Sequence, residues 1–397
     1  MIKKIVIRSF KSLDSVEVDL GLLNVFIGAN GSGKSNFLEA VGVLSAAASG
    51  RVNDATLLNR GVRSGVPKLY KSSFLNNPAP PHISLSANND NSEYSVSLHN
   101  PLESPEPDWM YKHERWSRIL KSGRKGNLAS RGPRQSDQKK LGLAALKAFD
   151  IRNTDSAYAF LKNLQDFRIY TPTTSVLRGV APETQPSHPL GLSGGRLPEA
   201  LGELIGLIEE DNFYDQITRN FFTLVEWAKE YSICESIKLP LSPSASASPW
   251  VIRFIDKYMS EGRNELSGYE ASEGALYVLF LTLLVSHPNS PNFCAVDNAD
   301  HGLNPLLAKS LFKHLSHWIL NAKKPKQLLI TTHNPLVLDG LLLNNGNIRL
   351  FSVNKSSSGK TEIKRIEITE EYQKMAKEGW TLSRLWTTGH LGGIYHV

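Results

Sequence analysis

The alternation of apolar and polar residues near the N-terminus predicts two strands, a third buried strand and a helix. Ile5 and Ile7, and then residues 16, 18 and 20, are apolar at every second position, which is typical of short strands with one buried face. Residues 22–27 are apolar almost throughout, as in a strand covered on both sides, and residues 36–40 begin a helix.

The last third of the chain alternates helices with short apolar strands. We predict helices over residues 273–285 and 306–320, and buried strands over residues 293–297 and 327–333. Residues 348–353 and 361–366 resemble a terminal hairpin. Such alternation favours a parallel sheet covered by helices, so the predicted fold class is α/β with a mostly parallel core sheet.

The middle of the chain has a different character. Residues 82–86 and 94–98 predict a hairpin, residues 121–140 a basic surface loop, residues 141–228 a mainly helical region and residues 240–249 a linker. We therefore expect an N-terminal half of the core at 1–120, which contains an antiparallel β part. A basic loop and helical insertion would follow at 121–250, and the C-terminal half of the core at 251–397.

Composition narrows the class of protein. With 397 residues, 41% hydrophobic and 21% charged, the chain is typical of a globular protein. Cys234 and Cys294 lie far apart, which favours a reducing compartment, and the apolar stretch 275–285 is too short to cross a bilayer. We expect a cytoplasmic protein without a membrane partner. Its net charge of 45 − 38 = +7 mildly favours an anionic partner.

The loop between the third strand and its helix carries the strongest chemical signal. Residues 28–35 match the phosphate-binding pattern G-x-x-x-x-G-K-[ST] in the strand–loop–helix context that this pattern requires. Glycines let backbone N–H groups point at phosphate oxygens, Lys34 would reach the β- and γ-phosphates, and the Ser35 hydroxyl would bind Mg²⁺. The predicted nucleotide-binding residues here are Asn30, Gly31, Ser32, Gly33, Lys34, Ser35 and Asn36.

Two strand ends add candidate residues for the same site. Asp297 ends an apolar strand, where its carboxylate could hold a Mg²⁺-bound water or the Ser35 hydroxyl. His333 follows another buried strand and could hydrogen-bond a γ-phosphate. A structural role is the alternative for both side chains.

These motifs together resemble those of the ABC-type ATPases of the SMC/RecF/OLD group. The resemblance comprises the opening residues 5–13, the phosphate loop with Asn36, Asp297 at its strand end, and the segment 331–335 with His333. In particular, the chain resembles the compact bacterial AAA family ATPases found beside phage-defence effectors, and the resemblance covers about half of the chain. It implies a P-loop NTPase fold with an ABC/SMC-like head, and ATP with Mg²⁺ as cofactors.

The family's signature motif has two candidates here, because residues 192–196 and residues 272–274 both look like it. The signature opens a helix shortly before the acid-ended strand and contacts the γ-phosphate held by the other subunit. Ser272 and Gly274 stand at that distance from Asp297, whereas Leu192 lies about 100 residues away. We therefore assign Ser272 and Gly274 as nucleotide-binding residues.

One position departs from the family pattern. Members of the group usually have Glu directly after the metal-binding Asp, and this chain has Asn298. An amide cannot accept a proton, and losing a general base typically lowers a rate about 10²–10⁴-fold. Asn298, Asp300 and His333 are the candidate catalytic residues, with Asp300 as an alternative base. We predict intact ATP binding and slow hydrolysis.

Two functions remain open from the sequence. In the first, a homodimer or higher homo-oligomer with ATP at its interface senses a signal and controls a separately encoded nuclease or toxin in antiphage defence. In the second, the protein is a RecF-like DNA-repair or DNA-end-binding ATPase, with nucleic acid bound by the basic stretch 121–140. A transporter ATPase fits poorly, because the motifs are too far apart.

Overall fold

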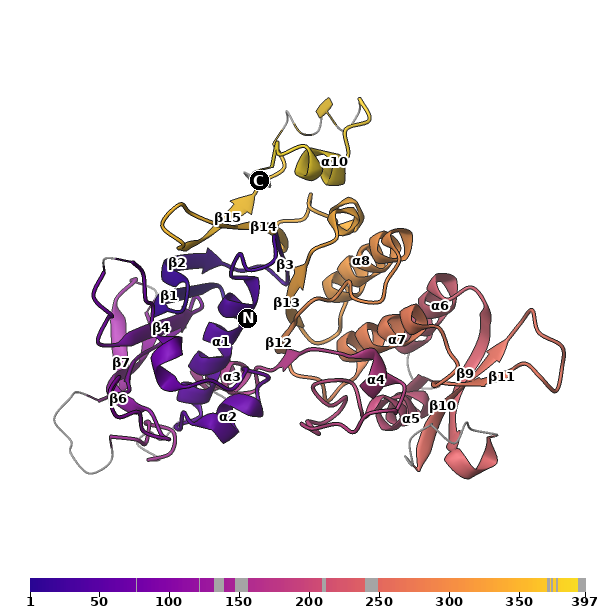
Figure 1. The fold of residues 1–397 in the computed structure, drawn as a ribbon, viewed down its shortest axis with the longest axis horizontal. Coiled ribbons are helices and arrows are strands. Elements are labelled where there is room, and N and C mark those ends of the chain that lie inside the picture. Colours follow the sequence, from indigo (N-terminus) through magenta and orange to yellow (C-terminus); the bar gives the residue numbers. More distant parts are fainter. Residues whose placement is uncertain are drawn as a thin grey trace.

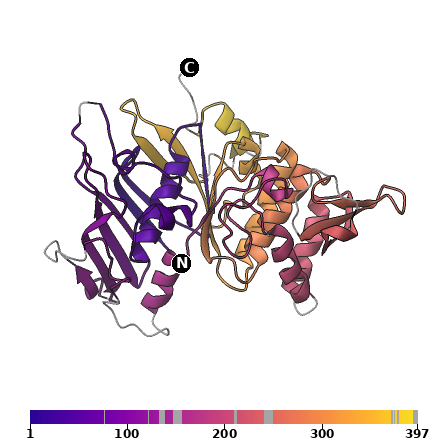
Figure 2. The ribbon, with the colours of Figure 1, turned by 60° about the horizontal axis from the view of Figure 1, so that its bottom comes forward.

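The structure is a computed structural model of the chain. It describes all residues except 76, 121, 132–138, 147–155, 209–211, 240–248, 370–371, 373, 376–377 and 392–397. An antiparallel sheet lies at one end, a smaller sheet lies at the other, and the central sheet runs between them (Figures 1 and 2).

The central sheet confirms the predicted α/β class. Its order is β15-β14-β3-β13-β12-β8, and every neighbouring pair is parallel except β14 with β15. The strands are β3 (Leu23–Gly28), β8 (Ile169–Tyr170), β12 (Phe293–Val296), β13 (Gln327–Thr332), β14 (Ile348–Lys355) and β15 (Thr361–Ile366). The predicted terminal hairpin is thus β14–β15, at the edge of this sheet.

Helices cover both faces of the central sheet, which explains its uniformly apolar strands. Leu23, Val25 and Ile27 of β3 pack in one hydrophobic core, and Phe26 packs in the other. The first core contains α7 (Glu273–Ser286) and α8 (Pro305–Leu320), and the second contains α1 (Lys34–Ala48) and α3 (Ser156–Gln165). Both long C-terminal helices were predicted from their apolar patterns.

The N-terminal antiparallel part is a sheet with the order β2-β1-β4-β5-β6-β7 in the described part of the chain. Its strands are β1 (Lys4–Phe10), β2 (Leu13–Asp19), β4 (Ile83–Asn88), β5 (Ser92–His99), β6 (Met110–Ile119) and β7 (Lys125–Arg131). The predicted hairpin at 82–98 is confirmed as β4–β5.

The prediction of a basic surface loop over residues 121–140 is wrong for residues 125–131. These residues form β7, which pairs with β6 at the edge of the sheet. An edge strand pairs on one side only and its side chains here are mostly exposed, so it can carry charged and polar residues without losing its backbone pairing. Lys121, Arg134 and Asp137 of the same stretch lie outside the described residues.

The region between the two halves of the core contains strands as well as helices. Its helices are α4 (Thr174–Leu177), α5 (Leu197–Ile208) and α6 (Asn212–Leu224), and β9 (Ala228–Glu235), β10 (Trp250–Asp256) and β11 (Glu265–Ser267) form an antiparallel sheet. The expected boundary at residue 250 therefore falls inside a sheet, and the predicted linker lies almost wholly outside the described residues. The division into three parts stays a prediction.

Shorter elements complete the fold. These are α2 (Asp54–Leu58), α10 (Leu382–Thr387) and the 3₁₀ helices η1 (Pro67–Tyr70), η2 (Ser236–Lys238) and η3 (Pro335–Gly340). Among the helices that the structure describes, none is both long enough and apolar enough to cross a membrane.

Candidate nucleotide-binding site

The loop between β3 and α1 has the backbone that a phosphate-binding loop needs. Gly31 and Gly33 have φ angles of 74° and 111°, in the left-handed region that favours glycine. A side chain at Gly33 would also place its Cβ 2.1 Å from the Thr361 hydroxyl oxygen. Glycine at this position therefore meets a backbone requirement and a packing requirement together.

Lys34 is the best-defined side chain of the loop. It is 5% exposed, and its ammonium donates hydrogen bonds to the carbonyl oxygens of Gly28 at 2.7 Å and Ala29 at 2.8 Å. Burial lowers the pKa of Lys34 to about 8, although the carboxylates of Asp297 and Asp300 oppose this shift. The ammonium is thus held at the mouth of the loop, where a phosphate oxygen would be a better partner than a carbonyl.

Asp297 lies at the carboxyl end of β12, and β13 separates that strand from β3. Its Oδ1 accepts a hydrogen bond from the Thr331 hydroxyl at 2.5 Å, and the Asn298 N–H donates to the same hydroxyl at 2.8 Å. Asn298 has a φ of 54°, a conformation that Asn tolerates better than most residues do. The turn after Asp297 is therefore tied to β13.

Asp300 positions the segment that carries His333. Its Oδ2 accepts hydrogen bonds from the backbone N–H groups of His333 at 3.3 Å and Asn334 at 3.1 Å. Its Oδ1 is buried without a hydrogen-bond partner among the described residues. This carboxylate is engaged with backbone groups on one side and shielded from water on the other.

His333 meets Lys34 directly. Its Nδ1 lies 3.3 Å from the Lys34 ammonium. Burial and then the positive charge of Lys34 lower the pKa of His333, which the two nearby carboxylates oppose. A neutral imidazole therefore faces the loop, with Nδ1 accepting from Lys34. The structure brings Lys34, Asp297, Asp300 and His333 into one cluster.

Ser272 and Gly274 lie at the start of α7. Ser272 is exposed and caps this helix, with its hydroxyl accepting a hydrogen bond from the Ala275 N–H at 3.3 Å. A Cβ at Gly274 would lie 3.2 Å from a methyl group of Leu307. The competing segment 192–196 forms a turn that leads into α5, whose first residue is Leu197.

The remaining loop residues have different surroundings. Asn30 is exposed at the tip, Ser35 is half-buried in the first turn of α1, and the Ser32 hydroxyl is buried without a partner in the described part of the chain. Asn36 donates from its side chain to the Ser12 hydroxyl at 2.8 Å. Asn36 therefore joins α1 to the turn between β1 and β2.

Sequence reasoning missed the residues that hold the loop from outside. The Thr361 hydroxyl lies 2.8 Å from the Ser32 carbonyl oxygen and 2.7 Å from the Ser12 hydroxyl. Thr361 begins β15, so the C-terminal hairpin packs directly on the phosphate loop. A threonine in a hairpin carries no local sign of such a contact, which joins residues more than 300 positions apart.

A buried strand, a glycine loop over a lysine, and an acid at the end of the strand two places away define a P-loop ATPase. The residues fit the phosphates of a nucleoside triphosphate, because the loop leaves no room for a side chain at Gly33 and the Ser32 hydroxyl has no partner among the described residues. The chain belongs to the family described as "AAA domain, putative AbiEii toxin, Type IV TA system", whose model matches residues 23–339.

Individual relatives match less of the chain or match it less closely. The DNA replication and repair protein RecF of Rhodococcus erythropolis is 42% identical over 65 residues, which is 16% of each chain. The SMC head domain from Thermotoga maritima is 14% identical over 92% of this chain and 99% of its own, with a TM-score of 0.42. An SMC head bound to the C-terminal winged-helix domain of ScpA is 16% identical over 94% of this chain and 99% of its own, with a TM-score of 0.49.

We predict that ATP affinity depends on the charge of Lys34. Bound phosphates favour the ammonium form, so affinity should be constant below about pH 8 and fall by up to tenfold per pH unit above it. Isothermal titration calorimetry between pH 7 and pH 9.5 would measure this, with proton uptake at the higher pH.

Lys326 provides the matched control for that experiment. Burial also lowers the pKa of Lys326 to about 8, but its ammonium binds the carbonyl oxygens of His287 and Ser290. Lys326→Arg should leave the pH profile unchanged, whereas Lys34→Ala should abolish binding. Unchanged ATP binding in Lys34→Ala would show that the loop is not the phosphate site.

Proposed function

We propose that the protein is a nucleotide switch in which two copies close around ATP. Each copy would hold one nucleotide on its phosphate loop and contribute Ser272 and Gly274 to the nucleotide of the other. The exposed position of Ser272 at the start of a long helix supports this proposal, because helix N-termini favour phosphate groups. ATP and Mg²⁺ would then join two subunits in a homodimer or a higher homo-oligomer.

The contacts of the loop from Asp297 to Asn304 are the main support for the proposed switch. Asp300 binds the backbone of the His333 segment, while His301 Nδ1 lies 2.9 Å from the Tyr277 hydroxyl of α7. A Cβ at Gly302 would lie 2.8 Å from the Glu273 side chain, so this loop also packs on the turn that carries Ser272. A change at the γ-phosphate position would therefore be transmitted through direct contacts to the turn at residues 271–274, which we call the signature turn.

Slow hydrolysis would make the closed state long-lived. Asn298 can orient a water but cannot accept its proton, and both hydrogen bonds of Asp300 serve to hold the His333 segment. The left-handed backbone at Asn298 offers a physical reason for Asn, because a Glu there would be strained by roughly 1 kcal/mol or more.

We infer that the output of this switch is a separately encoded effector, a nuclease or toxin, in antiphage defence. The family description, which names a putative toxin of a type IV toxin–antitoxin system, supports a defence setting. An ATP-dependent assembly with slow turnover suits such a role, because it holds a partner in one state until the nucleotide is lost.

The switch predicts that Ser272→Arg prevents ATP-dependent association, because the new side chain adds a bulky cation where the second nucleotide would sit. ATP binding to each subunit should be unchanged, since Ser272 is not part of the phosphate loop. Light scattering with and without Mg²⁺ and ATP would measure association, with calorimetry for binding. Ser193→Arg is the matched control and should affect neither, and loss of association in that variant alone would reverse the assignment.

The same assembly should be shortened in lifetime by Asn298→Glu, if the new carboxylate acts as a base. Phosphate release would rise, whereas Asn298→Gly, which also tolerates the left-handed backbone, should show no increase. Equal rates in both variants, together with an inactive Asp300→Ala, would move the role of the base to Asp300.

A second candidate function is DNA binding, which the outer face of the antiparallel sheet favours. Across neighbouring strands the register aligns Ser86, Ser95, Arg115 and Ser130 in one row, and Arg8, Ser84, Ser97 and His113 in the next. These residues line a groove of about 570 Å³. Within the described residues, Arg8, His113 and Arg115 form no ion pair, and arginine and serine side chains are frequent phosphate ligands.

If this groove binds duplex DNA, Arg8→Gln with Arg115→Gln should reduce the slope of log affinity against log salt by about two. Fluorescence anisotropy with a short labelled duplex would measure the slope. Lys162→Gln with Arg219→Gln removes two exposed cations of α3 and α6 and should leave it unchanged. An unchanged slope in the Arg8 and Arg115 variant would contradict DNA binding at this groove.

A further inference from the structure

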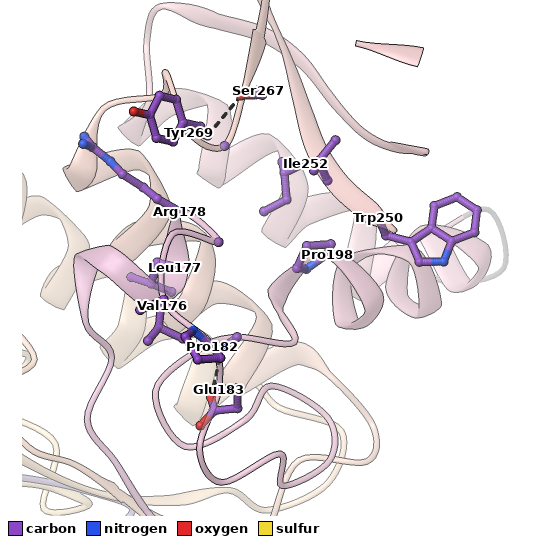
Figure 3. Close-up of a pocket in the computed structure, with 15 residues that line it drawn as sticks. Val176, Leu177, Arg178, Pro182, Glu183, Pro198, Trp250, Ile252, Ser267 and Tyr269 are labelled. Atoms are coloured by element: carbon purple, nitrogen blue, oxygen red, sulfur yellow. Dashed lines mark hydrogen bonds between the residues drawn. The ribbon is translucent and has the colours of Figure 1, made fainter. Parts of the chain in front are cut away.

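A cavity of about 210 Å³ (Figure 3) is lined by residues 267–269, which lie shortly before Ser272, and by no residue of the phosphate loop. It is enclosed by α4 with the loop that follows it, by the start of α5, and by β10 and β11. A single water molecule needs a cavity volume of about 10–15 Å³, measured in the same way, so this cavity is large enough for a small organic molecule.

The wall of the cavity combines apolar and polar groups. Val176, Leu177, Pro198 and Ile252 surround it, and Figure 3 shows Trp250 at one margin and Arg178 with Tyr269 at another. Apolar and aromatic walls with a few polar groups are typical of pockets for small molecules.

The glycine turn at 192–196 contributes Gly195 to the lining of this cavity, whereas Ser193 does not line it. A Cβ at Gly194 would lie 2.4 Å from a methyl group of Leu177, and one at Gly195 would lie 2.5 Å from the Glu183 Cβ. Glu183 Oε2 accepts hydrogen bonds from the N–H groups of Ser193 and Gly195, each at 3.0 Å. The glycines that resemble a nucleotide signature are therefore needed for close packing around the cavity.

Arg178 indicates the charge of the molecule that would fit. Its Nη2 donates to the Ala271 carbonyl oxygen at 3.3 Å, and its Nε is buried without a hydrogen-bond partner in the described part of the chain. Within those residues it forms no ion pair, while both oxygens of Glu183 accept bonds from backbone N–H groups. Figure 3 shows the Arg178 side chain extending toward Tyr269 at the margin of the cavity, so it would favour an acid whose carboxylate reaches this margin while its apolar body occupies the cavity.

The cavity is joined to the signature turn on both sides of Ser272. Arg178 binds the carbonyl oxygen of Ala271, and the Thr174 hydroxyl donates to the Glu273 carboxylate. Both donors belong to α4 or directly follow it, so an occupant that moves this short helix would move the turn.

We propose that this cavity binds a small acid with an apolar body and that its occupancy controls ATP-dependent association. The second part rests on the proposed nucleotide switch, whereas the binding site itself does not. Such a molecule would be the signal that the switch reads.

Indole-3-acetate and indole are suitable probes, because they share an aromatic body and differ in the carboxylate. We expect indole-3-acetate to bind at millimolar concentration or below, measured by ligand-observed nuclear magnetic resonance and calorimetry. Arg178→Gln should weaken this binding at least about tenfold and leave indole binding unchanged, as expected for the loss of a charge-assisted bond. Val176→Phe, which fills the cavity, should abolish binding of both probes.

Arg219→Gln is the matched control, because it removes an exposed cation of α6 that does not line the cavity. Wild-type protein that binds neither probe, or equal affinity for the acid in Arg178→Gln, would overturn the site. The second test measures ATP-dependent association at saturating indole-3-acetate. The ATP concentration that gives half-maximal association should change at least threefold. If that concentration is unchanged, the cavity does not control association. Absence of association without the probe would count against the switch and leave the binding result standing.

Discussion

The burial of the Lys34 ammonium among backbone carbonyls is the interaction on which the site depends. A buried cation needs polar partners, and the loop, in which Gly31 and Gly33 adopt left-handed backbone angles, supplies the Gly28 and Ala29 carbonyl oxygens. The strand order then places Asp297 and His333 around the same ammonium, since parallel strands end at one edge of the sheet. The fold therefore concentrates opposite charges and a neutral imidazole where a triphosphate would meet them.

Contacts around α7 connect this charge cluster to more distant surfaces. On one side, Gly302 packs on Glu273 and His301 faces Tyr277, which links the loop after Asp297 to the signature turn. On the other side, Thr174 hydrogen-bonds Glu273, which links the same turn to the cavity. The turn at Ser272 thus lies between a nucleotide site and a cavity, and Ser272 itself is exposed at the surface. A switch of the proposed kind requires this arrangement, because a signal at the cavity and the nucleotide at the phosphate loop must both act on the turn that would contact a second subunit.

The sequence predicts those parts of the fold that local patterns determine. The phosphate loop, the buried strands and the two long C-terminal helices follow from periodicity and glycine placement, and the structure contains them. Strand β7 was missed because charges and glycines suggest a loop, although at a sheet edge they are compatible with a strand. The contact of Thr361 with Ser32 and the cavity beside Arg178 could not be predicted, because they join segments that meet only in the folded chain. The structure gives the positions of Ser272, Asn298 and Asp300, but their chemical roles stay predictions.

The central claim is that ATP brings the phosphate loop of one subunit against Ser272 of another. Cysteine cross-linking tests it most directly, on a background in which Cys234 is replaced by Ser and the buried Cys294 is retained, because burial raises the pKa of its thiol. Protein carrying Asn30→Cys would be mixed with protein carrying Ser272→Cys and oxidised with and without Mg²⁺ and ATP. The account predicts a cross-linked dimer that contains one chain of each variant, forms with ATP, and is lost when Lys34→Ala is added. A mixed dimer that forms equally without ATP, or none with it, would contradict the account.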